Sequence, residues 1–218
     1  MNFNLEPFFQ KYEDLQSKVD GIFAKVQKDF PGCSKCAVEC SDCCYALFDL
    51  SLIEAMYINQ KFNETIKGDK KIELIEKANK ADRLVYKLKK QAYKEKMEGR
   101  SEDEIIVKMA LERIKCPLLN NEQKCDLYEF RPITCRIYGI PLSIQGRAHT
   151  CGISAFEEGI SYPTANMDII HQQLYAISQE FSQSIKTKYS QLGDLLVPLS
   201  MALLTVYDEE YFGISKTN

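Results

Sequence analysis

The sequence predicts a mainly α-helical protein whose helices pack around an irregular, cysteine-rich metal-binding segment. Two observations lead to this fold class. Apolar residues recur three and four positions apart in several long stretches, which is the spacing of a buried helix face. The nine cysteines fall into two groups, and residues 45–115 between them contain none. This layout predicts one metal-binding region assembled from two distant segments.

The composition indicates a single folded domain over residues 1–218, with the cysteine-cluster region at 33–151. Hydrophobic residues make up 45% of the 218 positions, which is enough for a core. The net charge of −3 favours neither nucleic acid nor a membrane as an obligate partner. No signal-peptide pattern opens the chain, and the longest apolar-rich run, residues 195–206, is too short to span a bilayer. We therefore expect a cytoplasmic protein with an unknown protein or redox partner, in an oligomeric state that stays open.

Periodicity predicts helices over residues 4–30, 51–61, 69–98, 102–115, 166–185 and 198–213. The first has a continuous apolar seam formed by Leu5, Phe8, Tyr12, Leu15, Val19, Ile22 and Val26. Ser51 and Ser101 each precede a glutamate by three positions, so Glu54 and Glu104 are expected to reach back as parts of capping boxes. The third helix has a basic stripe, predicted to be a solvated face rather than a nucleic-acid surface: Lys80, Arg83, Lys87, Lys90 and Lys94.

Residues 116–165 are expected to be largely irregular. This stretch holds four prolines and four glycines and has no long periodic pattern. A short hairpin is the only strand structure that the sequence favours here, within residues 136–148. The second group of cysteines is therefore expected on loops.

Clustered thiols in a reducing compartment favour metal over disulfides. The count of nine is odd, and the chain is too long to need covalent staples. Thiolates are soft ligands that select zinc, Cu(I) or iron–sulfur clusters. Cys33 and Cys36, like Cys40 and Cys43, have a spacing that lets two sulfurs reach one metal. The adjacent side chains of Cys43 and Cys44 diverge, so this pair is expected to serve two metals or to bridge them.

These residues resemble the YkgJ-type cysteine-cluster family of zinc- or iron-chelating proteins. The matching motifs are Cys36-x3-Cys40-x2-Cys43-Cys44, Cys116-Pro117-Leu118-Leu119, Lys124-Cys125, Tyr128-Glu129-Phe130-Arg131-Pro132, Cys135-Arg136-Ile137-Tyr138-Gly139 and Cys151. The resemblance covers roughly residues 36–151. It implies metal ligation by eight cysteines: Cys36, Cys40, Cys43, Cys44, Cys116, Cys125, Cys135 and Cys151. Cys33 falls outside this pattern and is a candidate for a free, reactive thiol.

Eight thiolates need compensating positive charge when they are buried. We interpret Arg131 and Arg136 as groups that surround the ligand set and neutralise it, although Arg131 could instead pair with Glu129. His149 lies two residues before Cys151 and could replace a thiolate ligand. His171 is expected to pack on or beside an apolar helix face.

The predicted function is therefore binding of an iron–sulfur cluster, or of zinc, on the eight cysteines. The wide spacing of the second group favours iron–sulfur, whereas structural zinc prefers compact paired knuckles. A chain of this kind would be an iron–sulfur oxidoreductase or a protein-modifying enzyme, and the sequence leaves open whether it is an enzyme. The alternative is a non-catalytic, zinc-stabilised module for protein interaction.

Overall fold

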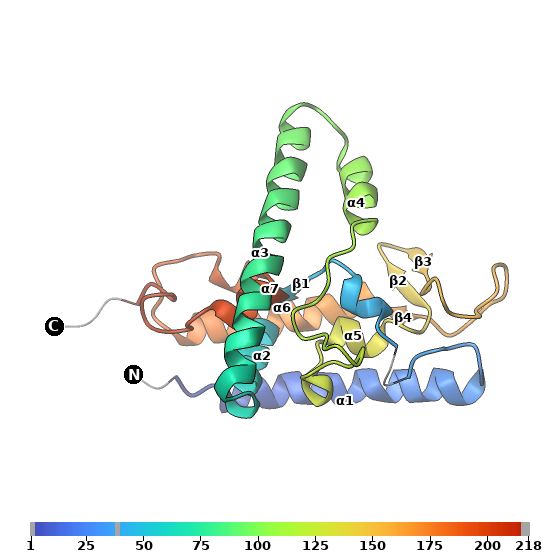
Figure 1. Cartoon of the computed structure of the whole chain (residues 1–218), viewed down its shortest axis with the longest axis horizontal. Helices are drawn as coiled ribbons and strands as arrows, with labels where there is room; N and C mark the ends of the chain where they lie inside the picture. Colours follow the sequence, from blue (N-terminus) through green and yellow to red (C-terminus); the bar gives the residue numbers. More distant parts are fainter. Residues whose placement is uncertain (1–2, 38–39, 215–218) are drawn as a thin grey trace.

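The computed structural model describes residues 3–37 and 40–214, and it confirms the mainly helical fold class. The α-helices of these residues are α1 (Glu6–Asp29), α2 (Leu52–Thr65), α3 (Gly68–Met97), α4 (Glu102–Ala110), α5 (Ile133–Ile137), α6 (Met167–Ser184) and α7 (Leu199–Leu204). Short 3-10 helices occupy η1 (Asp42–Tyr45), η2 (Tyr128–Phe130) and η3 (Leu192–Asp194). In Figure 1 the segments that carry the cysteines lie above α1 and to the right of the lower half of α3.

The strands are short and form two small sheets. β1 (Asp49–Ser51) pairs antiparallel with β5 (Leu196–Pro198), which joins the entry to α2 with the entry to α7. β2 (Leu142–Ile144) pairs antiparallel with β3 (Arg147–His149) and parallel with β4 (Ala165–Asn166). The predicted hairpin is present at 142–149, whereas the pairing of β1 with β5 has no signal in the sequence.

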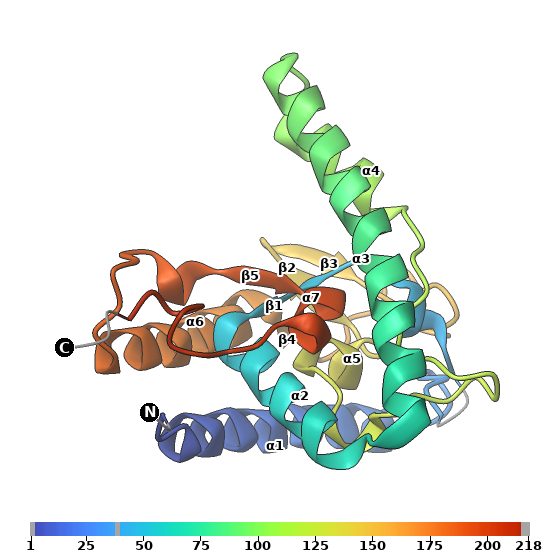
Figure 2. The ribbon, with the colours of Figure 1, turned by 60° about the vertical axis from the view of Figure 1, so that its left-hand side comes forward.

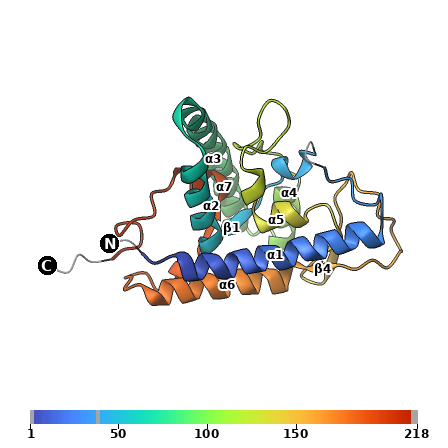
Figure 3. The same cartoon turned by 90° about the horizontal axis from the view of Figure 1, so that it is seen from below.

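Helices α1 and α6 lie side by side and run antiparallel (Figure 3). The ring of Phe8, near the start of α1, packs edge to face on Phe181, near the end of α6. Lys11 and Glu180 form an ion pair at the same end. The predicted seam of α1 is buried at Tyr12, Leu15, Val19 and Val26, but Ile22 is 39% exposed.

Glu54 corrects one sequence-based expectation. The Ser51 hydroxyl caps α2 by accepting from the Glu54 N–H, as predicted. The Glu54 carboxylate, however, turns into the core, where its Oε1 accepts from the Tyr12 hydroxyl and the Ile133 N–H, both at 2.8 Å. Burial raises the pKa of this carboxyl. Glu54 therefore ties α1 and α5 to α2 instead of reaching back to the helix start.

Helices α3 and α4 form an arm that projects from the body (Figures 1 and 2). The inner half of α3 is buried through Leu74, Ala78, Ala81 and Val85, and its predicted basic stripe is exposed. The outer half carries large apolar side chains that are mostly exposed, among them Tyr86, Tyr93 and Met97 of α3 and Ile106, Val107 and Leu111 in and after α4. Glu95 of α3 accepts a hydrogen bond from Lys108 of α4 at 2.5 Å, which connects the two helices.

Two helices end earlier than their sequences predict. The expected helix 102–115 stops at Ala110, because residues 113–116 pair through their backbone with residues 44–46. The Cys116 N–H donates to the Cys44 carbonyl at 2.7 Å there. The helix expected to reach residue 213 stops at Leu204, where the Asn59 amide donates to the carbonyls of Ala202 and Thr205.

The segment 116–165 is also more ordered than predicted, because it contains η2, α5, the hairpin β2–β3 and the start of β4. Helix α5 has only five residues, too few to produce a periodic pattern. The hairpin turns at Gln145 and Gly146, whose φ angles of 51° and 73° lie in the left-handed region. None of the helices in the described residues is long and apolar enough for a membrane span.

Candidate metal centre

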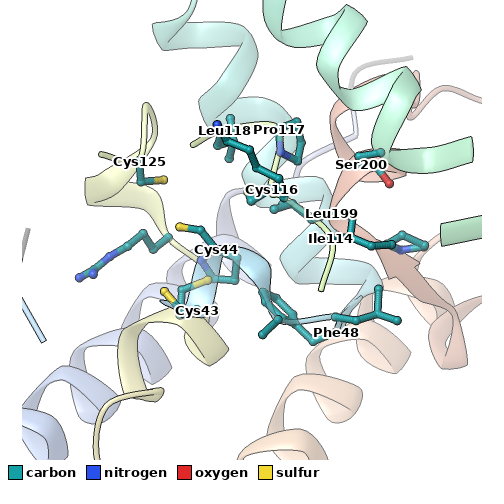
Figure 4. A pocket seen from close by; sticks show the side chains of 18 of the residues that line it. Cys43, Cys44, Phe48, Ile114, Cys116, Pro117, Leu118, Cys125, Leu199 and Ser200 are labelled. Carbon is teal, nitrogen blue, oxygen red and sulfur yellow. The ribbon is translucent and has the colours of Figure 1, made fainter. Parts of the chain in front are cut away.

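Five of the eight predicted ligands line one cavity of about 60 Å³. They are Cys43, Cys44, Cys116, Cys125 and Cys135. They come from η1, from the two ends of the loop after α4, and from α5. Figure 4 shows the sulfur atoms of Cys44 and Cys125 pointing into the same space. Cys44, Cys116, Cys125 and Cys135 are called the inner thiol set below.

Local backbone pairing explains how two distant segments supply one cavity. Cys116 is held against η1 by its hydrogen bond to the Cys44 carbonyl. The loop that follows folds back on itself, because the Asn120 side-chain oxygen accepts from the N–H groups of Glu122 and Lys124. A bridge between Leu119 and Cys125 completes this fold. The loop thereby brings Cys125 back to the thiol cavity that Cys116 also lines.

Cys43 is the electrostatic centre of the group. The thiols of Cys135 and Cys44 donate hydrogen bonds to its sulfur and lower its pKa, and Arg131 acts in the same direction. The same interactions, together with burial, raise the pKa of Cys44 and of Cys135. Because the thiolate and not the thiol binds metal, Cys43 is the sulfur best prepared to take the first ion.

The remaining inner thiols are neutral at neutral pH. Burial and the neighbouring Cys125 raise the pKa of Cys116 to about 12. Burial raises the pKa of Cys125 to about 11, although the Leu127 N–H and Arg131 oppose the shift. A metal ion that binds here must displace these protons.

The other three predicted ligands, Cys36, Cys40 and Cys151, form the outer thiol set. Burial and then Cys40 raise the pKa of Cys36 to about 11, and Cys43 and Cys151 contribute further. The Cys151 thiol donates to Asp42 Oδ2 at 3.5 Å. Cys43 therefore interacts with thiols of both sets.

Asp42 and Gly139 belong to this outer region, and the sequence interpretation missed both roles. Arg113 donates to Asp42 Oδ1 at 2.6 Å, so the carboxylate joins a guanidinium to the Cys151 thiol. A Cβ on Gly139 would lie 2.0 Å from the Cys36 sulfur, so only glycine leaves room for that thiol. An acidic residue inside the run from Cys40 to Cys44 was the available signal for Asp42.

The two predicted arginines have different surroundings. Arg131 lines the cavity, and its guanidinium stacks over the Tyr128 ring at 3.7 Å. Its Nε is buried without a hydrogen-bond partner in the described residues. Arg136 instead donates to the carbonyls of Arg131 and Glu129 and to Asp20 Oδ2, at 2.8 Å. The hydrogen bonds of Arg136 thus connect α1 with η2, and within the described residues none of them goes to a thiol.

The histidines and Cys33 lie outside the two thiol sets. His149 and His171 both line a second, larger cavity. The Cys33 carbonyl accepts from the Ala155 N–H at 2.8 Å. Its neighbour Ser34, by contrast, directly affects the Cys36 thiol by lowering its pKa.

Across residues 3–37 and 40–214, no three His, Cys, Asp or Glu side chains surround one point as metal ligands. The donor set nevertheless fits a soft metal or an iron–sulfur cluster, because five thiols share one cavity. The orphaned Nε of Arg131 supplies a buried donor beside them. Binding would require thiol side chains to rotate toward a common point.

The fold and this arrangement define a helical cysteine-cluster protein. A family model named CxxCxxCC, with the description "Putative zinc- or iron-chelating domain", matches residues 33–152, which is more than half of the chain. The chain belongs to this family, as its resemblance to cysteine-cluster chelating proteins predicted. Searches of the curated proteins and of the solved structures found no significant match.

Proposed function

We propose that the chain holds iron–sulfur clusters in two neighbouring centres, on the eight cysteines that match the family pattern. The inner thiol set would hold one centre. The outer thiol set would hold the other, and Cys43 completes it or bridges the two. The observation that carries the proposal is the convergence of five thiols on one cavity whose other walls are mostly apolar.

Two features favour iron–sulfur over zinc at the inner set. The four cysteines come from three separate segments, and clusters accept such wide spacing more readily than structural zinc does. Apolar side chains such as Leu118, Leu127 and Phe130 line the cavity, and a hydrophobic shell of this kind tunes the reduction potential of a cluster. A bound cluster supplies electron transfer, which suits an oxidoreductase or a protein-modifying enzyme with a redox partner.

The residues of this chain would hold and balance the cluster charge. Arg131 and Lys115 both line the cavity and bring positive charge to it. The positive charge of Arg131 lowers the pKa of Cys43 and opposes the rise in the pKa of Cys125. Gly139 leaves the space in which the Cys36 thiol can turn.

The test is to purify the protein without oxygen and to measure iron, acid-labile sulfide and zinc on one sample. We expect a brown protein with visible absorbance and with iron and sulfide in equal amounts. A colourless protein with about two zinc ions per chain, the number that eight thiolates would hold, would contradict the iron–sulfur proposal.

A zinc-stabilised interaction module is the second candidate, and the arm formed by α3 and α4 favours it. The arm exposes Tyr93, Met97 and Ile106 by more than half, and isolated projections of this kind are common partner surfaces. Under this function zinc would only hold the body together. The same metal analysis separates the two candidates.

A further inference from the structure

A second cavity lies beside the two thiol sets, and Cys151 is the one predicted ligand among the described residues that line it. It has a volume of about 540 Å³ and is bounded by residues 46–49, by α5, by the hairpin β2–β3 and by α6. The segment Ala46–Phe48 lines this cavity on one side and the inner thiol cavity on the other. A single layer of chain thus separates the two spaces.

The size of this cavity is that of a ligand site. Cavities that bind small organic molecules measure roughly 300–1,000 Å³ and combine apolar walls with a few polar groups. The walls here include the apolar side chains of Phe48, Leu142, Met167 and Leu174. His149 and His171 are both exposed, so the cavity is open to solvent where they lie.

The charges at the wall limit what can bind. Two acidic residues, Asp49 and Glu54, line the cavity, and among the described residues that line it none is Lys or Arg. Both Asp49 oxygens accept from Lys89. Glu54 is only 2% exposed, and both hydrogen bonds that it accepts within the described residues go to Oε1. An anionic ligand would meet carboxyl groups at this wall, and the cation next to them, Lys89, is already paired with Asp49.

The cavity also touches the outer thiol set. Cys151 lines it, and so does Tyr138, whose pKa is raised to about 12 by burial and by Asp42. Asp42 in turn accepts from the Cys151 thiol. A molecule in the cavity would therefore lie directly beside one of the proposed metal ligands.

We propose that this cavity binds a small organic molecule with an apolar or aromatic body and an uncharged or cationic polar end. Apolar contacts with Phe48 and Leu174 hold the body, while the histidines, the tyrosines and Glu54 accept or donate hydrogen bonds at the polar end. Binding places the molecule next to Cys151. This inference goes beyond metal binding and does not depend on which metal the thiols hold.

Direct binding of three indoles tests the proposal on the full-length, metal-loaded protein. Tryptamine, tryptophol and indolepropionate share one aromatic body and differ in charge. The chain has 12 tyrosines and no tryptophan, so indole fluorescence anisotropy reports the ligand alone when the excitation wavelength lies beyond the absorption of tyrosine. We expect saturable binding of tryptamine and tryptophol, and binding of indolepropionate that is about tenfold weaker. No saturable binding of any probe, or a preference for indolepropionate, would overturn the proposal.

Two leucine variants locate the binding. Leu196 lines the cavity and is 51% exposed, so Leu196→Arg adds a cation to the wall with little cost to the fold. It should weaken tryptamine binding about tenfold and strengthen indolepropionate binding. Leu195→Arg adds the same charge one residue away, at a side chain that is 41% exposed and does not line the cavity. Equal effects of the two variants would show that the probes bind elsewhere.

Metal content is measured on the same samples, which keeps this proposal separate from the proposed function. Indole binding by a protein that holds zinc would leave the cavity assignment intact and contradict only the iron–sulfur proposal. A brown, cluster-loaded protein that binds none of the indoles would support the iron–sulfur proposal and contradict the cavity assignment.

Discussion

The inner and outer thiol sets share Cys43 but differ in their surroundings. The inner set faces a cavity of about 60 Å³ with mostly apolar walls, and burial contributes to the raised pKa of Cys116 and of Cys135. The outer set lies beside the polar side chains of Asp42, Tyr138 and Arg113, and the Arg113 side chain is 47% exposed. Solvent can therefore screen charge at the outer set, whereas the protein itself must balance charge at the inner set.

This difference indicates two kinds of metal centre in one chain. An ion at the inner set would cross-link η1, the loop 116–125 and α5, so its binding energy contributes directly to folding. An ion at the outer set would cross-link Cys36 and Cys40 to Cys151. The inner centre is thus expected to be slow to exchange its metal and the outer centre to be more labile.

The largest effect is expected from Cys43→Ser, because Cys43 interacts with both sets. We expect the metal content to fall to near zero and the free energy of unfolding to drop by several kcal/mol, since metal binding and folding are coupled. Elemental analysis and urea denaturation measure the two quantities. A variant that keeps the full metal content would show that Cys43 is not a ligand that the two thiol sets share.

The next comparison is Cys135→Ser against Cys151→Ser. The first removes an inner ligand and should lower both the metal content and the unfolding free energy, the latter by about 3 kcal/mol or more. The second removes an outer ligand and should lower the metal content with a loss of about 1 kcal/mol or less. Equal destabilisation by the two variants would remove the distinction between the sets.

The sequence predicted those parts of the fold that depend on local pattern. The buried seam of α1 and the serine caps of α2 and α4 follow from spacing along one helix. The ends of α4 and α7 depend instead on partners far along the chain, namely residues 44–46 and Asn59. A periodic pattern contains no information about such partners.

The candidate site, too, has features that the sequence predicts and features that it does not. Spacing and family resemblance identify eight cysteines, but they do not say which ones are neighbours. Cys151 meets Asp42 from 109 positions away, and Cys116 meets Cys44 across the whole arm. Arg136 directly follows Cys135 in the sequence and Arg131 precedes it by four positions, yet of these two arginines it is Arg131 that lines the thiol cavity. Their side-chain directions depend on α5 and η2, which are too short to predict.

The two arginines provide the third prediction. Arg131→Met removes the cation that lowers the pKa of Cys43 and of Cys125, so protons compete better with metal at these thiols. We expect the metal affinity of the inner set to fall about 10–100-fold. The midpoint of metal loading should move to higher pH, because more alkaline solution is needed to remove thiol protons whose pKa has risen. A titration with a competing chelator at several pH values measures both effects.

Arg136→Met is the matched control for that experiment. It removes the hydrogen bonds to Asp20 and to two backbone carbonyls, which should lower the unfolding free energy by about 1–3 kcal/mol. Metal affinity and its pH dependence should stay at the wild-type values. A shift in the loading midpoint as large as that of Arg131→Met would place Arg136 beside the thiols after all.

The smallest effect is expected from Cys33→Ser. Cys33 contacts Ala155 through its backbone carbonyl, and serine preserves that hydrogen bond. Metal content, visible absorbance and the denaturation midpoint should match the wild type within error. The neighbouring Cys36→Ser is the positive control, because its thiol interacts with Cys40, Cys43 and Cys151 and should lose the outer metal. If Cys33→Ser loses metal to the same extent, the outer centre uses Cys33 as a ligand and the set of eight is assigned incorrectly.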